Sequence, residues 1–310
     1  METDHSLPGI DLDQYRSRIR LDEPYEQRNG TISSEKEREE ILDFLLDTLI
    51  IHERLADIDN LPADIKNKKQ LLRALLNIRP PGQMKKDFIE NINKLLEDEL
   101  KKKKILDCNK IAPVSEVFTE NRLKNPDTLF LWKGDITSLK IDAIVNAAND
   151  KMLGCFRPLH NCVDNVIHSA AGPLLREDCK TIMDIQGAEE ETGDAKITRA
   201  YNLPSKYVIH TVGPVIMMKK ASEFQREQLA SCYISCLSVA ARMKEIKSIA
   251  FPCISTGVFS FPRKLAAEIA VRTVDEWLEG NSHPFSNVVF NVFLEEDFSI
   301  YARIFRGENN

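Results

Sequence analysis

The chain has 310 residues, of which 43% are hydrophobic and 29% are charged, an ordinary composition for a globular protein. A formal net charge of −6 argues against a protein built chiefly to hold nucleic acid phosphates. The sequence shows no apolar run of transmembrane length, and its N-terminus is too polar and acidic for a signal peptide. Seven cysteines without a secretion signal favour a reducing compartment. We therefore expect a cytoplasmic protein that has neither nucleic acid nor membrane partners.

The N-terminal third divides into two parts. Residues 1–33 are polar without a sustained period, which predicts a tail or an irregular strap over the surface. Residues 34–106 predict a helical extension, and its first helix starts at Ser34, where Glu37 would complete a capping box. The apolar spacing predicts two further helices, over Lys66–Ile78 and about Lys85–Lys103. Since three short helices make a thin core, we expect the extension to pack against the rest of the chain.

Residues 107–310 show short strands that alternate with helices. The expected strands are rich in Val, Ile and Phe, and they are Leu129–Trp132, Ala143–Asn146, Tyr207–Thr211, Ile249–Cys253 and Val288–Phe293. The expected helices are Val163–Ala171, Leu174–Met183, Glu223–Met243 and Lys264–Glu279. This alternation predicts an α/β fold in which helices cover both faces of a sheet. Open sheets of this kind bind ligands at the carboxyl ends of their strands.

Residues 146–168 place several metal-binding side chains in an expected strand-to-helix turn. Cys155, His160 and Cys162 have the residue types that one zinc ion prefers. His160 and Cys162 face the same side only on an extended segment, so both can bind one ion only if the helix over 163–171 begins directly after Cys162. We therefore predict a zinc site beside a ligand crevice.

Other interpretations stand beside this one. The spacing C-x4-H-x-C matches no standard zinc-finger pattern, so these residues could be a buried histidine and two core cysteines. With three protein ligands, a zinc ion keeps one position for water or substrate, as in catalytic sites. A fourth ligand such as Asp164 or His168 would close the site and favour a structural role.

Two loops suggest a nucleotide or phosphate site. The loop Ile254–Phe259 follows an expected strand, carries hydroxyl groups and a glycine, and can turn its backbone N–H groups toward a phosphate. Asp135 follows the first expected strand, where it could accept a hydrogen bond from an adenine amino group or cap a turn. From the residues alone, the turn is favoured.

These motifs together resemble the macrodomain family, whose members bind ADP-ribose. The resemblance lies in GDIT at Gly134–Thr137, VNAAN at Val145–Asn149, HTVGP at His210–Pro214 and ISTGVFSFP at Ile254–Pro262. The usual glycine-rich run after the NAAN motif is replaced by GCFRPLHNCVDNVIH, which looks like the zinc-dependent protein ADP-ribosyl hydrolases of microbes. LLRALLNIRPP at Leu71–Pro81 is similar to the helical N-terminal extension of that branch. The resemblance implies a three-layer α/β/α macrodomain with a mostly parallel mixed sheet, preceded by a small helical extension.

The resemblance also implies roles for single residues. Asp135 and Ile136 would hold the adenine, and Asn146 and Asn149 would line the distal ribose. The diphosphate and the distal ribose would be held by Ser255, Thr256, Gly257, Val258 and Phe259. Cys155, His160 and Cys162 match the zinc ligands. Asp164 matches an acidic residue near the scissile bond, so Asp164 and Asn149 are the expected catalytic residues.

The implied function is removal of mono-ADP-ribose from modified protein side chains by a zinc-dependent hydrolase. Its partners would be ADP-ribose and ADP-ribosylated protein, and its cofactor would be Zn²⁺. One alternative is a non-catalytic reader of ADP-ribose with a structural zinc. Another is a deacetylase acting on O-acetyl-ADP-ribose in the same pocket.

Overall fold

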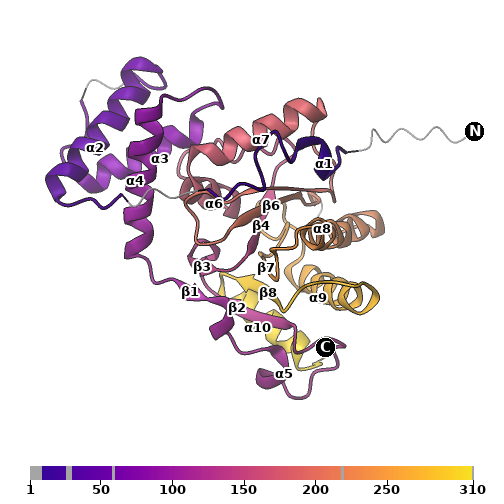
Figure 1. Ribbon diagram of the computed structural model, residues 1–310. Helices are drawn as coiled ribbons and strands as arrows, with labels where there is room; N and C mark the ends of the chain where they lie inside the picture. The colour runs from indigo at the N-terminus through magenta and orange to yellow at the C-terminus, as the bar shows by residue number, and fades with distance from the viewer. Residues whose placement is uncertain (1–8, 26–29, 58–59, 218–219, 309–310) are drawn as a thin grey trace, which may run out of the picture.

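The computed structural model describes residues 9–25, 30–57, 60–217 and 220–308. Figure 1 shows a central sheet with helices on both sides and a group of three helices projecting at one flank. These three form the helical extension, α2 (Glu35–Asp47), α3 (Ile65–Ile78) and α4 (Lys86–Lys102). The α/β/α prediction is confirmed by this arrangement. None of the described helices combines the length and the apolar character needed to cross a membrane.

The central sheet has six strands in the order β2-β8-β7-β4-β6-β5. Every neighbouring pair is parallel except β5 and β6, which are antiparallel, so the sheet is mixed and mostly parallel. The strands are β2 (Leu129–Lys133), β4 (Ala143–Ala148), β5 (Ala195–Arg199), β6 (Tyr207–Val212), β7 (Ser248–Phe251) and β8 (Asn287–Val292). Two short strands, β1 (Leu106–Asp107) and β3 (Leu139–Lys140), pair in parallel beside it.

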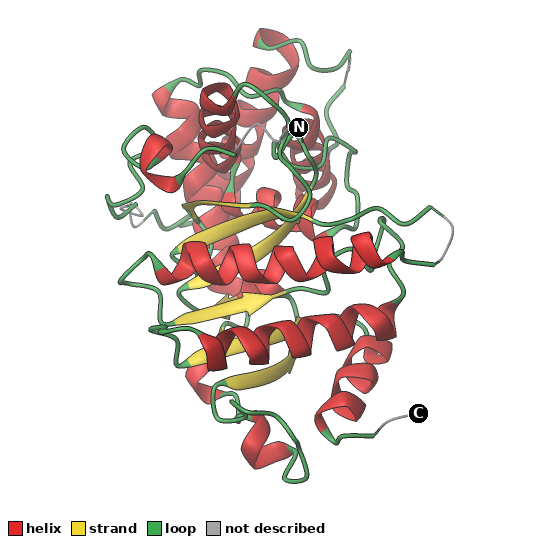
Figure 2. Ribbon diagram, turned by 90° about the vertical axis from the view of Figure 1, so that its right-hand side faces the viewer, coloured by secondary structure: helices red, strands yellow, loops and turns green. Residues whose placement is uncertain are grey.

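Helices cover both faces of the sheet, because its strands carry apolar side chains on both sides. Along β8, Val288 and Phe290 join the core formed with α8, α9 and α10, whereas Val289 joins the core formed with α6. The covering helices are α6 (Val163–Ala171), α7 (Pro173–Gln186), α8 (Glu223–Ala241), α9 (Arg263–Gly280) and α10 (Glu295–Phe305). Figure 2 shows the two long helices, α8 and α9, lying side by side across one face. A short helix, α5 (Val114–Val117), precedes β2.

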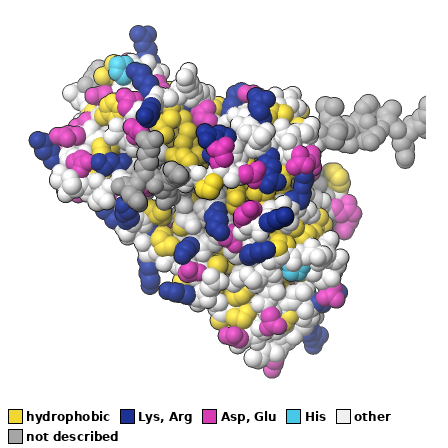
Figure 3. Space-filling view, in the orientation of Figure 1, with side chains coloured by type: hydrophobic (Ala, Val, Ile, Leu, Met, Phe, Trp, Pro, Cys, Tyr) yellow, Lys and Arg dark blue, Asp and Glu magenta, His cyan; other side chains and the backbone are white. Residues whose placement is uncertain are grey.

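The helical extension has an apolar core of its own and also contacts the α/β domain. Its core residues come from all three helices, and they include Leu42, Leu45, Leu72, Leu75, Phe88 and Ile92. As predicted, Ser34 caps α2 by accepting a hydrogen bond from the backbone of Glu37, although the Glu37 carboxylate binds Ser33 and not Ser34. The first helix then continues into a π-helical turn, Thr48–His52. On the face seen in Figure 3, basic and acidic side chains are interspersed over both parts of the molecule.

The described residues 9–25 form a strap that includes the short helix α1 (Leu12–Tyr15). Leu12, Tyr15, Ile19 and Leu21 are buried in the core that the sheet shares with α8 and α9, so these residues form a strap, the second of the two predicted alternatives. Figure 1 shows α1 beside α7. The strap covers the open edge of β5, where the Ile197 backbone N–H donates a 3.0 Å hydrogen bond to the Tyr15 hydroxyl. Residues 1–8 and 26–29 lie outside the described residues.

Two predicted strands end earlier than expected. The strand expected over Ile249–Cys253 is β7, which stops at Phe251, and β8 stops at Val292. Cys253 and Phe293 therefore belong to the loops that follow these strands. These loops line the cavity at the carboxyl edge of the sheet.

Candidate functional site

A cavity of about 700 Å³ opens at the carboxyl ends of β2, β4, β7 and β8. Loops from these strands and the first turn of α6 form its wall. It is lined by all but one of the predicted site residues, namely Asp135, Ile136, Asn149, Cys155, His160, Cys162, Asp164, Ser255, Thr256, Gly257, Val258 and Phe259. The sheet thus gathers residues that are more than 100 positions apart in the sequence, at the edge where α/β folds bind ligands.

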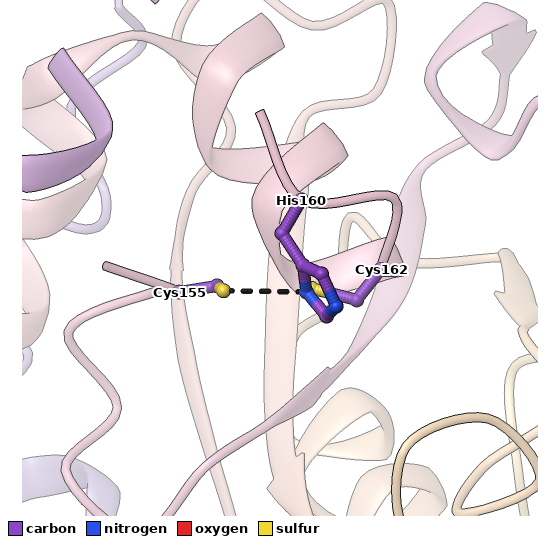
Figure 4. A group of neighbouring side chains, drawn as sticks. All are labelled: Cys155, His160 and Cys162. Atoms are coloured by element: carbon purple, nitrogen blue, oxygen red, sulfur yellow. Dashed lines mark hydrogen bonds between the residues drawn. The ribbon is translucent and has the colours of Figure 1, made fainter. Parts of the chain in front are cut away.

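The metal-ligand candidates lie on an irregular segment, residues 153–162, which we call the Cys/His arm. Figure 4 shows the side chains of Cys155, His160 and Cys162 pointing toward one another. The Cys155 thiol lies 3.5 Å from Nδ1 of His160. Cys162 has extended backbone angles and is the N-cap of α6, where its sulfur accepts from the Asn165 backbone. The predicted extended approach to this helix is therefore confirmed.

The ligand atoms of the trio fit one zinc ion. The two sulfurs and one imidazole nitrogen all lie within 4.8 Å of one another. Ligand atoms on a tetrahedral zinc lie roughly 3.5 Å apart, because its bonds are about 2.0–2.3 Å long. Burial raises the pKa of the Cys162 thiol in the metal-free protein, so a bound cation would have to displace its proton.

The surroundings favour an open site over a closed one. Across the described part of the chain, no fourth His, Cys, Asp or Glu joins the trio. Asp164 and His168, which the sequence offered as closing ligands, lie outside it. The trio also lines the cavity and is half-buried, which distinguishes it from core cysteines such as Cys232.

Asp164 brings a buried carboxylate to the cavity wall. It lies on the first turn of α6, and the helix N-terminus favours its negative form. Burial nevertheless raises its pKa to about 6, against the opposing effects of a hydrogen bond from Asn146 and the charge of Arg176. Asn149 donates to the backbone oxygen of Gly154 across 3.2 Å and lies 3.5 Å from Asp164 Oδ2.

Asn146 was predicted to line the distal ribose. It is fully buried and does not line the cavity. Its amide nitrogen lies 2.8 Å from Asp164 Oδ1 and 3.2 Å from Nδ1 of His210. Burial lowers the pKa of His210 to about 3, so the ring is neutral, and Nδ1 accepts while Nε2 faces the Thr198 hydroxyl. Asn146 therefore supports Asp164 from beneath the cavity.

The predicted phosphate loop follows β7 and lines the same cavity as the Cys/His arm. Ser255 has a left-handed backbone, with φ of 63°. Ser255 lines the cavity, and its hydroxyl is buried without a hydrogen-bond partner. Gly213, from the loop after β6, approaches it so closely that a Cβ there would lie 2.0 Å from the Ser255 oxygen.

Asp135 caps the turn after β2, as the residues alone favoured. Its Oδ1 accepts from the backbone N–H and the hydroxyl of Thr137. Lys103, at the end of α4, lies 3.2 Å from its other oxygen. Asp135 and Ile136 also line the cavity, so capping and ligand contact are compatible at this position.

Several lining residues were not predicted from the sequence. Those that follow β8 are Phe293 and Leu294, and Asp297 and Arg263 pair across the same end of the cavity at 2.6 Å. A simple rule would have found Phe293 and Leu294, because they follow a parallel strand just as Asp135 and Ser255 do. The position of Asn161 on the Cys/His arm carries no such signal.

The fold and this cavity define a macrodomain. The family model for the Macro domain matches residues 145–270. A Trypanosoma brucei macrodomain solved with ADP-ribose is similar, with 32% identity, a TM-score of 0.54, and coverage of 65% of this chain and 77% of that one. An Oceanobacillus iheyensis macrodomain solved with ADP gives 38% identity, a TM-score of 0.52, and coverage of 58% and 92%.

Curated relatives match almost the whole chain. A protein-ADP-ribose hydrolase of Staphylococcus aureus strain MRSA252 is 42% identical over 90% of this chain and 98% of its own length. A protein-ADP-ribose hydrolase of Treponema medium is 46% identical over 79% of this chain and 90% of its own length. The chain therefore belongs to the macrodomain family, and it shares with these relatives a region that reaches beyond the macrodomain.

Proposed function

We propose that this protein removes mono-ADP-ribose from modified protein side chains, with a zinc ion held by Cys155, His160 and Cys162 beside the distal ribose. One observation carries the proposal: the thiol–imidazole trio and Asp164 line the same cavity as the phosphate loop. The curated relatives named protein-ADP-ribose hydrolase support the reaction class.

In this proposal, different residues of the cavity bind different parts of ADP-ribose. Asp135 accepts from the adenine amino group with the oxygen that faces Lys103. The backbone of Ser255–Phe259 donates to the diphosphate, and Phe259 packs against the distal ribose. Asn149 can donate to and accept from a sugar hydroxyl. The linkage to the modified side chain then lies between Asp164 and the Cys/His arm.

Asp164 is the proposed acceptor for the proton of the attacking water. Asn146 donates to Oδ1 of its carboxylate, and Asp164 lines the cavity. Asn149 lies close enough to Oδ2 to keep that second oxygen oriented. A zinc ion at the trio would supply a Lewis acid that lowers the pKa of bound water or orients ribose hydroxyls.

The test uses one mono-ADP-ribosylated protein substrate and measures its demodification, zinc content and ADP-ribose affinity. Cys162→Ala and His160→Ala should lose zinc and turnover together. Cys232→Ala, a buried core cysteine, and His52→Ala, an exposed histidine of the extension, are matched controls and should retain both. Asp164→Ala should lose rate while ADP-ribose binding largely persists.

The outcomes separate the proposal from its alternatives. Turnover that survives the loss of zinc excludes a catalytic metal. Tight ADP-ribose binding by the zinc-loaded wild type without any turnover identifies a reader with a structural metal. Consumption of O-acetyl-ADP-ribose without release from protein identifies a deacetylase.

A further inference from the structure

The Cys/His arm has no regular secondary structure, yet its three ligand side chains already converge. Leu159, directly before His160, has a left-handed backbone with φ of 54°, which is unfavourable for a leucine. Gly154, at the start of the arm, has φ of 82°. A segment with such a backbone needs contacts from outside to hold one conformation.

The first outside contact comes from Asn77 on α3, in the helical extension. Its side-chain oxygen accepts from the Leu159 backbone N–H across 3.0 Å. Its amide nitrogen donates to the Ser169 hydroxyl on α6 across 3.1 Å. Asn77 is 2% exposed, so both bonds are protected from water. One side chain thus joins the extension, the arm and α6 at the residue that precedes His160.

The second contact runs from Arg73 through Asn165. Arg73, one turn before Asn77 on α3, donates to the Asn165 side-chain oxygen across 2.9 Å. This leaves the buried amide nitrogen of Asn165 facing the backbone oxygens of Cys155 and Arg157, at 3.4 Å and 3.1 Å. The Asn165 backbone N–H also donates to the Cys162 sulfur. Arg73 therefore orients a residue that contacts both cysteine positions of the trio.

The third contact fixes the start of the arm. Arg176 on α7 donates to the Leu153 backbone oxygen across 2.7 Å. It also donates to the Leu76 backbone oxygen at the end of α3 across 2.9 Å. The arm is thereby held near residue 153, between residues 155 and 157, and at residue 159, each time with a link to α3.

We infer that α3 of the helical extension preorganises the metal centre, with Asn77 and Arg73 as positioning residues for Cys155, His160 and Cys162. The inference rests on the proposed function for its metal, but its geometry concerns the arm alone. Groups that orient metal ligands typically contribute about 10- to 100-fold in metal affinity. The extension then positions the metal ligands in addition to packing against the α/β domain.

The experiment compares Asn77→Ala and Arg73→Ala with Asn93→Ala in the full chain. Asn93 is a matched control, since it also links the extension to the α/β domain, through a 2.8 Å hydrogen bond from Asn202, but does not contact the arm. Zinc affinity is measured by competition with a chromophoric chelator, and ligand geometry by the visible absorption of bound cobalt(II). Hydrogen exchange of residues 153–162 is measured in the metal-free proteins.

We expect Asn77→Ala and Arg73→Ala to weaken zinc binding by about 10- to 100-fold, to alter the cobalt spectrum and to speed exchange in the arm. Asn93→Ala should match the wild type in all three. The inference would be overturned if Asn77→Ala and Arg73→Ala matched Asn93→Ala both in zinc affinity and in hydrogen exchange of the arm. If Asn77→Ala does not fold, the Arg73→Ala variant still tests the inference, because Arg73 is only half-buried. A wild type that binds no zinc defeats the proposed function, while arm exchange still decides the role of α3.

Discussion

The side chain of Asn146 donates a hydrogen bond to Asp164 across 2.8 Å; both residues are buried, but only Asp164 lines the cavity. The neutral ring of His210 accepts from the same amide nitrogen and fixes its orientation. In the proposed reaction Asn146 would therefore act through Asp164, although the sequence placed it at the distal ribose. Asn146 therefore holds the carboxylate of Asp164, and the binding of the sugar is left to residues that line the cavity.

Asn146→Ala should lower the rate of demodification by about 10- to 100-fold, because a hydrogen bond to a charged group contributes about 1.5–3 kcal/mol. ADP-ribose affinity should change much less, since Asn146 does not line the cavity. Single-turnover kinetics and calorimetric titration measure the two quantities. The control for a general loss of packing is Asn287→Ala. Asn287 is buried at the amino end of β8, away from the cavity at the carboxyl ends of the strands. Equal losses in rate and affinity would contradict the assignment.

Asp135 and Asp107 allow a matched test of the proposed adenine contact. Each caps a 3-10 turn by accepting from the backbone two residues later, but Asp107 does not line the cavity. Asp135→Ala should weaken ADP-ribose binding by about tenfold or more, whereas Asp107→Ala should leave it unchanged. Ribose 5-phosphate, which lacks adenine, should bind both variants equally. A similar loss for ribose 5-phosphate would show that Asp135 shapes the cavity instead.

Local patterns predicted much of the fold and most of the cavity. The limits of α6 were predicted correctly because its apolar face and its extended N-cap, Cys162, are both local features. β5 was missed because its sequence AKITR contains two cations, and burial of Lys196 depends on an ion pair with the buried Glu190 at 2.6 Å. The burial of Asn146 could not be predicted from the sequence either. A strand covered on both faces shows no alternation of polar and apolar residues, so its sequence does not indicate which side chains face the cavity.

Asp178 on α7 gives a pH-dependent prediction away from the metal ligands. Burial raises its pKa from 3.8 to about 6, against the hydrogen bond from Tyr201 and the charge of Arg199. The native state therefore holds this proton over a pH range in which the unfolded chain has lost it. Stability from this group is complete below about pH 4 and declines as pH rises through 6.

Asp178→Asn cannot ionise, so it should lack this decline. The unfolding free energy of the wild type relative to Asp178→Asn should fall by up to about 3 kcal/mol between pH 4 and pH 7. Urea unfolding at several pH values measures the difference. Asp184→Asn, exposed on the same helix, should run parallel to the wild type. A difference that stays constant with pH would show that Asp178 ionises normally in the folded protein.

The strap makes a prediction about stability at the edge of the sheet. Tyr15→Phe removes the acceptor of the Ile197 backbone N–H while it keeps the buried ring. A buried donor without a partner costs about 1–3 kcal/mol, so the urea midpoint should fall and exchange of the Ile197 amide should speed up. Tyr207→Phe, a half-buried tyrosine of β6, should change stability by less than about 0.5 kcal/mol. An unchanged midpoint and unchanged exchange in Tyr15→Phe would mean that the strap covers the β5 edge by apolar packing alone.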